Sequence, residues 1–120
     1  MTSKRTVVYG IPNCDTVKKA RTWLESHGVA FEFHDFKKAG LTASLVKDWL
    51  ADVPLEVLLN RRGTTWRGLP EEAKAAAETQ AGAIALMVEK PSVVKRPVVA
   101  VDGRVKSVGF SADEYAALYA

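Results

Sequence analysis

The only cysteine in the chain, Cys14, lies where a turn gives way to a helical pattern. The apolar run that includes Tyr9 stops at Gly10, and Pro12 lies within the turn that follows. The first N–H groups of a helix lack internal partners, and the helix dipole favours negative charge there. A thiol in such a place has its pKa lowered from about 8.5 to roughly 3.5–7.5. Cys14 is therefore predicted to be an activated nucleophile, and the alternative is a structural cysteine buried in the core.

The charged residues around Cys14 also bear on the state of its thiol. Lys18 and Lys19, one turn along the helix, favour the thiolate, whereas Asp15 opposes it. Backbone N–H groups of the stretch Asn13–Thr16 are expected to help hold an anion at the start of the helix. The candidate substrate-binding residues at this end are Asn13, Asp15 and Thr16.

Arginines from two other segments are further candidates for binding an anion. Arg96 and Pro97 come immediately before an apolar run that predicts a strand. Proline cannot donate to a sheet ladder, so on its own the pair is typical of a strand start beside a solvated arginine. Arg61 and Arg62 stand in the polar, glycine-broken stretch 60–67, which predicts a loop.

The elements that must position these residues begin with a βαβ pattern. A short strand is predicted at 6–9, an amphipathic helix at 16–27 and a second strand at 29–36. Gly28 supplies the left-handed stop of the helix. Two strands joined through one helix in this way are expected to be parallel, with a right-handed crossover.

The middle of the chain, about residues 40–92, is predicted to form a helical subdomain. Thr42 can cap a first helix, and a short segment suited to burial follows at 55–59. Pro70 lies early in another helix, and a further helix covers about 80–89. No linker or repeat interrupts the pattern, so the chain 1–120 is expected to be a single domain with this subdomain inside it.

The last third of the chain returns to strands. Residues 98–101 and 104–108 flank Asp102-Gly103, which is a strong signal for a tight hairpin. The stretch Ser111–Glu114 has the form of a capping box and predicts a closing helix. The order βαβ, helical block, ββα favours an α/β fold with one mixed sheet and helices packed on it.

Composition narrows the function classes further. The chain has 120 residues, of which 48% are apolar and 26% charged, as is typical of one globular domain. One cysteine excludes an internal disulfide and a cysteine-based zinc site, and two histidines do not make a metal site. No secretory signal and no stretch of about 20 apolar residues is visible, so a cytoplasmic protein without membrane contact is expected. The net charge of +3 comes without a dense basic tract, so it does not indicate nucleic-acid binding, and a small anionic ligand would account for it equally well.

Four motifs taken together resemble the arsenate reductase (ArsC)/Spx family, and most closely its YffB-type branch. They are Tyr9–Ala20, Phe33–Phe36, Leu58–Trp66 and Lys95–Val98, in the family's order. The resemblance covers essentially the whole chain. It implies a thioredoxin-like fold with a four-stranded mixed sheet and an inserted helical subdomain. It also implies that Cys14 is catalytic, that Pro97 is cis and faces it, and that Arg96 points to the same pocket.

The chain departs from the arsenate-reductase pattern at the oxyanion site. Arsenate reductases of this family use three arginines around the cysteine, and Arg96 matches one of them. The position of the second arginine is occupied by Asn60. The position of the third lies near Gly109, where the chain has no cation. The adjacent Arg61 and Arg62 could reach in, so they are candidate substrate-binding residues. The resemblance therefore favours the family but not arsenate as the substrate.

The function expected on these grounds is that of a glutathione-dependent thiol oxidoreductase. The Cys14 thiolate would attack an oxyanion or a disulfide sulfur. With no second cysteine in the chain, the adduct must be cleared from outside, by glutathione and with glutaredoxin as a further partner. No cofactor is expected to be bound, and the protein is expected to be a monomer.

The alternative is an Spx-like regulator that binds the RNA polymerase α subunit without catalysis. Spx-type regulators carry a second cysteine three residues after the first, and Val17 occupies that position here. The local disulfide of those regulators therefore cannot form. A third possibility is a family member that has lost all activity.

Overall fold

The computed structural model describes residues 5–119 and divides into two compact units. Of the described residues, the first contains 5–39 together with 96–119. The second contains residues 40–95. The second unit is thus an insertion between two strands of the first, and each unit is described by itself.

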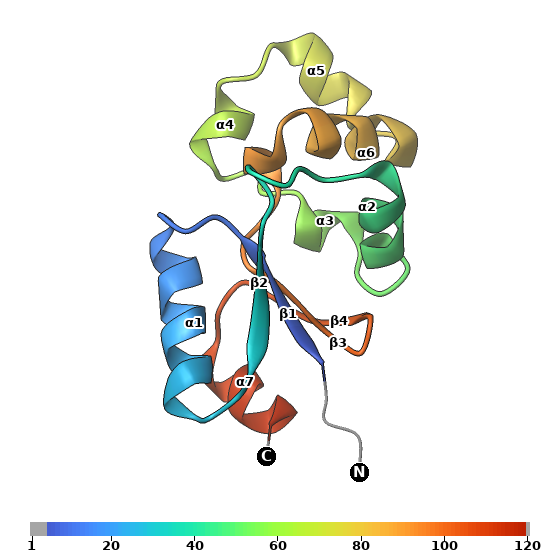
Figure 1. Ribbon diagram of the computed structural model, residues 1–120. Helices are drawn as coiled ribbons and strands as arrows, with labels where there is room; N and C mark the ends of the chain where they lie inside the picture. Colours follow the sequence, from blue (N-terminus) through green and yellow to red (C-terminus); the bar gives the residue numbers. More distant parts are fainter. Residues whose placement is uncertain (1–4, 120) are drawn as a thin grey trace. The chain divides into compact units, whose positions relative to one another are not determined.

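The first unit is built on a four-stranded sheet in the order β2-β1-β3-β4 (Figure 1). The strands are β1 (Thr6–Gly10), β2 (Phe31–Asp35), β3 (Val98–Val101) and β4 (Arg104–Val108). β1 and β2 are parallel, whereas β3 runs antiparallel to both β1 and β4. The prediction of a mixed sheet that starts from a parallel βαβ unit is confirmed.

Two helices, α1 (Asp15–Ser26) and α7 (Ala112–Leu118), bury their apolar sides on one face of this sheet. The fully buried residues of the cluster are Val8, Ala20, Leu24, Val99 and Tyr115. They come from β1, α1, β3 and α7, so the cluster joins both helices to the two central strands. Burial of this kind contributes roughly 1.5–3 kcal/mol per large apolar side chain. It holds α1 in place, and the start of α1 is where the cysteine lies.

Gly10, the last residue of β1, lies against the first turn of α1. A Cβ atom at Gly10 would lie only 2.8 Å from Cγ2 of Val17, which is itself fully buried. A larger residue would push the helix away from the strand, because packed interiors leave no room for an extra methyl group. Glycine at this position thus lets the helix start close to the end of β1.

The turns of the first unit follow the sequence signals, with one exception. Gly28 ends α1 with φ +68°, and the β3–β4 hairpin turns through Asp102 and Gly103, both with positive φ. Ser111 caps α7, because its Oγ accepts a hydrogen bond from the Glu114 N–H at 3.3 Å. The Glu114 carboxylate does not complete the predicted capping box. It instead accepts a hydrogen bond from the hydroxyl of Ser107 on β4 at 3.3 Å.

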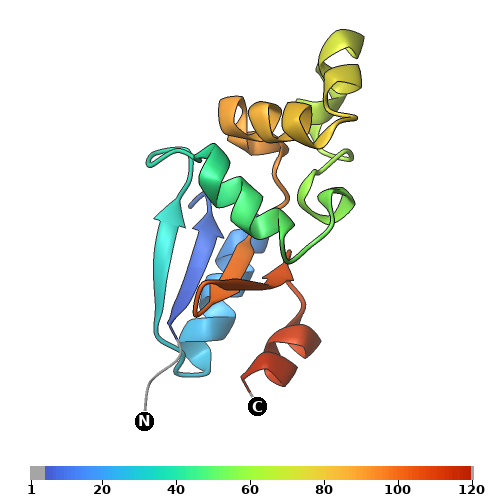
Figure 2. The same ribbon diagram turned by 90° about the vertical axis from the view of Figure 1, so that its right-hand side faces the viewer.

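The second unit is helical. Its elements are α2 (Ala43–Leu50), α3 (Leu55–Leu58), α4 (Thr64–Arg67), α5 (Glu71–Ala76), α6 (Gln80–Glu89) and the 3₁₀ turn η1 (Pro91–Val93). α6, orange in Figure 2, packs against α2, in green, and also contacts α5. Thr42 caps α2 as predicted, since its Oγ1 accepts from the Leu45 N–H at 3.1 Å.

Three features of this unit differ from the sequence prediction. The stretch predicted as a loop over 60–67 contains the helical turn α4, which is too short to show a helical period. Pro70 is the N-cap of α5 rather than a residue inside it. Residues 91–93 form a 3₁₀ turn where only a helix end was predicted. No helix in the described part of the chain is long and apolar enough to cross a membrane.

Candidate active site

Cys14 occupies the N-cap position of α1. Its backbone is extended, with φ −109° and ψ 125°, and its carbonyl accepts the first helical hydrogen bond from the Lys18 N–H at 2.9 Å. Its side chain is partly exposed. The thiol is therefore open to a substrate while it lies next to the free N–H groups of the first helical turn.

Burial and three neighbouring groups set the pKa of the Cys14 thiol. Burial raises the pKa, but the N–H group of Val17, the hydrogen bond and positive charge of Arg96, and the N–H group of Thr16 lower it. The balance lies below the ordinary value for a cysteine. The lowered pKa agrees with the expectation from the helix start.

The cause of this shift differs in part from the sequence prediction. Lys18 and Lys19 are exposed and are not among the groups that lower the pKa of Cys14. The cation that does so is Arg96, which is 82 positions away in the chain and is brought to the thiol by the sheet.

The sheet register explains how Arg96 reaches the cysteine. Val98, the first residue of β3, pairs with Tyr9 near the end of β1. Because the two strands are antiparallel, the residues just before Val98 lie beyond the carboxyl end of β1, where the loop to Cys14 begins. The Arg96–Pro97 peptide bond is cis, as the family resemblance implied. The Pro97 carbonyl accepts a hydrogen bond from the Gly109 N–H at 2.8 Å.

The remaining predicted residues of the first unit flank the thiol along the chain. Asn13 is exposed in the turn before Cys14, and Asp15 is the exposed first residue of α1. Thr16 is partly exposed and acts on the thiol through its backbone N–H group. The first unit thus brings together the Cys14 thiol, the Arg96 guanidinium and the first N–H groups of α1, an arrangement that can stabilise a thiolate and a bound anion.

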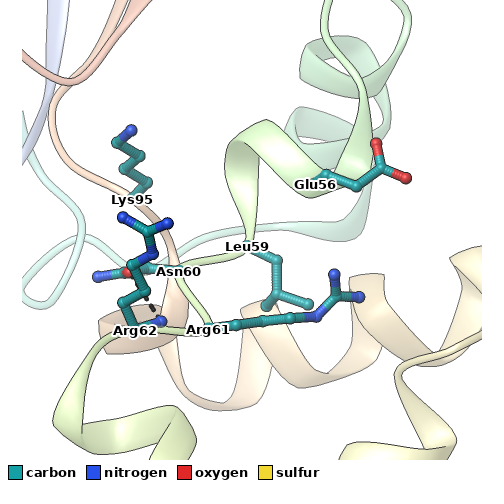
Figure 3. A pocket seen from close by; sticks show the side chains of 6 residues that line it. All are labelled: Glu56, Leu59, Asn60, Arg61, Arg62 and Lys95. Atoms are coloured by element: carbon teal, nitrogen blue, oxygen red, sulfur yellow. Dashed lines mark hydrogen bonds between the residues drawn. The ribbon is translucent and has the colours of Figure 1, made fainter.

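Arg61 and Arg62 belong to the second unit, where they lie in the segment that leads into α4. Both are exposed, and both line an open pocket of about 550 Å³ in this unit (Figure 3). The other residues that line it are Glu56, Leu59, Asn60 and Lys95. Lys95 was not a predicted site residue. The signal that could have found it is its position directly before Arg96.

The two histidines take part in aromatic contacts. The ring of His27 stacks on Trp23 with ring centroids 3.8 Å apart, and its Nδ1 lies 2.8 Å from the Trp23 carbonyl oxygen. The ring of His34 lies 5.0 Å from that of Tyr9. Among residues 5–119, no group of three His, Cys, Asp or Glu side chains is placed to hold a metal ion.

Comparison with known proteins agrees with the fold. Residues 9–118 match the model of the ArsC family. The chain belongs to the ArsC family. Its thioredoxin-like fold is shared by solved structures of that family, as the resemblance implied.

Three proteins illustrate what this ArsC-family chain is similar to. The structure of a YFFB protein is 48% identical, covers 96% of this chain and 99% of its own, and has a TM-score of 0.89. An arsenate reductase (ArsC) related protein from Brucella melitensis is 49% identical, covers 99% of this chain and 98% of its own, and has a TM-score of 0.76. The global transcriptional regulator Spx of Streptococcus agalactiae serotype V is 29% identical over 86% of this chain and 74% of its own.

The origin of the thiol pKa in this ArsC-family chain gives a direct prediction. The alkylation rate of Cys14 by iodoacetamide should rise with pH to a midpoint below about 8.5, the value of a free thiol. Arg96→Gln should raise this midpoint, because the thiolate loses a hydrogen bond and a neighbouring positive charge. Lys18→Gln is the matched control and should leave the midpoint unchanged. A wild-type midpoint at or above about 8.5 would contradict an activated thiol.

Proposed function

We propose that this protein is a glutathione-dependent thiol oxidoreductase with Cys14 as its nucleophile. The observation that carries the proposal is the thiol of lowered pKa at the start of α1, beside Arg96. A lowered pKa gives more thiolate at neutral pH, and the thiolate is the reactive form of cysteine. The arsenate reductase (ArsC) related protein from Brucella melitensis supports the same class of chemistry.

The proposed reaction is an exchange of disulfides. The Cys14 thiolate attacks the glutathionyl sulfur of a mixed disulfide, the substrate S–S bond breaks, and the substrate leaves as a thiolate that takes a proton from water. A glutathione thiolate then attacks the glutathionyl sulfur on Cys14 and releases the protein thiolate. The products of the second step are oxidised glutathione and free Cys14, so one substrate disulfide is reduced for one disulfide formed.

Anion binding at the thiol is proposed to depend on Arg96 and on N–H groups of α1. A guanidinium can hold a carboxylate through two parallel hydrogen bonds, and the N–H groups at a helix start are free to bind an anion. Asn13, Asp15 and Thr16 border the same position along the chain. Arg61 and Arg62 remain proposed contacts for a further anionic group of the substrate.

Intact-mass measurement after incubation with oxidised glutathione tests this function. The wild type should gain one glutathionyl group, and Cys14→Ser should gain none. Added reduced glutathione, alone or with glutaredoxin, should return the wild type to its original mass. A wild type that stays unmodified under mildly oxidising conditions would show that glutathione is not the partner.

The second candidate function is that of an Spx-like regulator, which the 29% identity to the Streptococcus agalactiae protein favours. Val17 stands where Spx-type regulators have their second cysteine, so a redox switch of that kind is not proposed. Capture of the RNA polymerase α subunit by the purified protein would support the regulator, and its absence would favour the enzyme. For the enzyme we propose a cytoplasmic monomer with no bound cofactor.

A further inference from the structure

The second unit contains a basic pocket that involves neither Cys14 nor Arg96. It is the pocket of about 550 Å³ in Figure 3, with Arg61, Arg62 and Lys95 as its cations and Glu56 as its one acidic side chain. Such a volume is within the range of small-molecule sites in proteins. The lining is polar and positively charged, so an anionic ligand is the class that it suits.

A β-bridge brings two of these cations together from distant parts of the sequence. Leu59 and Val94 pair in antiparallel fashion. The Asn60 N–H donates to the Val93 carbonyl, and the Lys95 N–H donates to the Leu58 carbonyl, both at 2.7 Å. The two segments are therefore tied at the backbone, so the backbone on both sides of the pocket is in place before a ligand binds.

The backbone of Arg62 is fixed by a turn around Asn60. The side-chain Oδ1 of Asn60 accepts a hydrogen bond from the Arg62 N–H at 3.3 Å. The backbone carbonyl of Asn60 accepts one from the Gly63 N–H, also at 3.3 Å. A Cβ atom at Gly63 would lie 2.9 Å from Asn60 Nδ2. A side chain at Gly63 would therefore displace the Asn60 amide group, whose oxygen accepts the hydrogen bond from the Arg62 N–H.

The cations differ in how far their charge is already satisfied. The Arg61 guanidinium lies 5.6 Å from the centre of the Trp66 ring, and it also borders a second pocket with Glu71 and Glu78. In Figure 3 its side chain points away from those of Arg62 and Lys95. Within residues 5–119, neither Arg62 nor Lys95 forms an ion pair.

We propose that Arg62 and Lys95 form a binding site for a doubly charged phosphate group, either free or carried by a small molecule. Two like charges that line one pocket repel each other, and one dianion between them would offset that repulsion. Arginine offers a planar fork for phosphate oxygens, and lysine adds a compact charge. The inference does not depend on the proposed thiol chemistry.

Titration of the ¹⁵N-labelled full chain with inorganic phosphate and with glycerol phosphate, at constant ionic strength, tests the proposal. Saturable shifts are expected at the amides of Arg62 and Lys95. Arg62→Gln and Lys95→Gln should each weaken binding by about 10- to 100-fold, which is the usual effect of losing a charged hydrogen bond. Tighter binding of glycerol phosphate would identify a phosphorylated small molecule, and equal binding would identify the free ion.

Two controls keep the test specific. Arg61→Gln removes the same charge from the same segment and should change the affinity by less than about threefold, because charge alone acts weakly at a solvated surface. Cys14→Ser should bind phosphate like the wild type. The proposal is wrong if the wild type shows no saturable binding, if Arg61→Gln is as damaging as Arg62→Gln, or if the shifts centre on Thr16 and Val17.

Discussion

Cys14→Ser is expected to lower the turnover of glutathione mixed disulfides by about 10⁴-fold or more, as removal of a nucleophile does in other covalent mechanisms. Serine keeps the size of the side chain but not a group that ionises near neutral pH. The N–H groups and the Arg96 guanidinium that stabilise a thiolate would then have no anion to act on. The chain has no other cysteine that could replace it.

The measurement is a coupled assay in which NADPH and glutathione reductase report the oxidised glutathione formed. Lys18→Gln is the matched control for the neighbourhood of the thiol. Lys18 is exposed and is not among the groups that lower the pKa of Cys14, so the turnover of this variant should stay within a few-fold of the wild type. Substantial turnover by Cys14→Ser would mean that another group carries the reaction.

Arsenate is expected to be a poor substrate. Its kcat/KM should be roughly 10²- to 10⁴-fold lower than that of a mixed disulfide of glutathione. Holding arsenate against a thiolate needs several cations, because the two anions repel each other, and each lost charged contact costs roughly 1.5–3 kcal/mol. Asn60 and Gly109 stand at two of the three arginine positions that the family resemblance gives. Gly109 also has φ +86°, so an arginine there would be strained.

Arg96 is the one arginine of the three that this chain keeps, and it should contribute to activity on every substrate. Arg96→Ala is expected to lower kcat/KM by about 10- to 100-fold on mixed disulfides, through a weaker bound anion and a less acidic thiol. Arg96→Lys keeps the charge but loses the planar fork, so it should recover part of the activity. Efficient arsenate turnover by the wild type would overturn the argument on substrate. Unchanged activity of Arg96→Ala on all substrates would remove Arg96 from the site.

Local sequence signals predicted most of the fold. The strands at 98–101 and 104–108 and the helix at 80–89 have the predicted bounds, because turn residues and apolar periodicity mark both ends of each element. The single turn α4 (Thr64–Arg67) was missed, since four residues cannot show a helical period. The β-bridge between Leu59 and Val94 was missed because pairing between distant residues leaves no local pattern.

In the site, too, features that depend on neighbouring residues could be predicted, and contacts between distant residues could not. The place of Cys14 at a helix start could be predicted, because a turn and a helical pattern adjoin it in the sequence. The sequence suggested Lys18 as a source of the lowered pKa, since it is near in the chain, but Arg96 is the cation that acts. The presence of Arg62 and Lys95 in one pocket was equally hidden, because it depends on a backbone bridge between two segments that are far apart in the sequence.

The insertion of residues 40–95 between β2 and β3 has a consequence for how the chain folds. Pairing of β1 with β3 closes this whole segment as a loop, and closing a flexible loop of that length costs about 3–4 kcal/mol in entropy. If the helical insertion forms first, its local contacts fix the separation of its two ends before the strands meet. The late step then joins strands across a segment that is already ordered, so mutations that loosen the insertion should slow formation of the sheet as well as weaken the insertion itself.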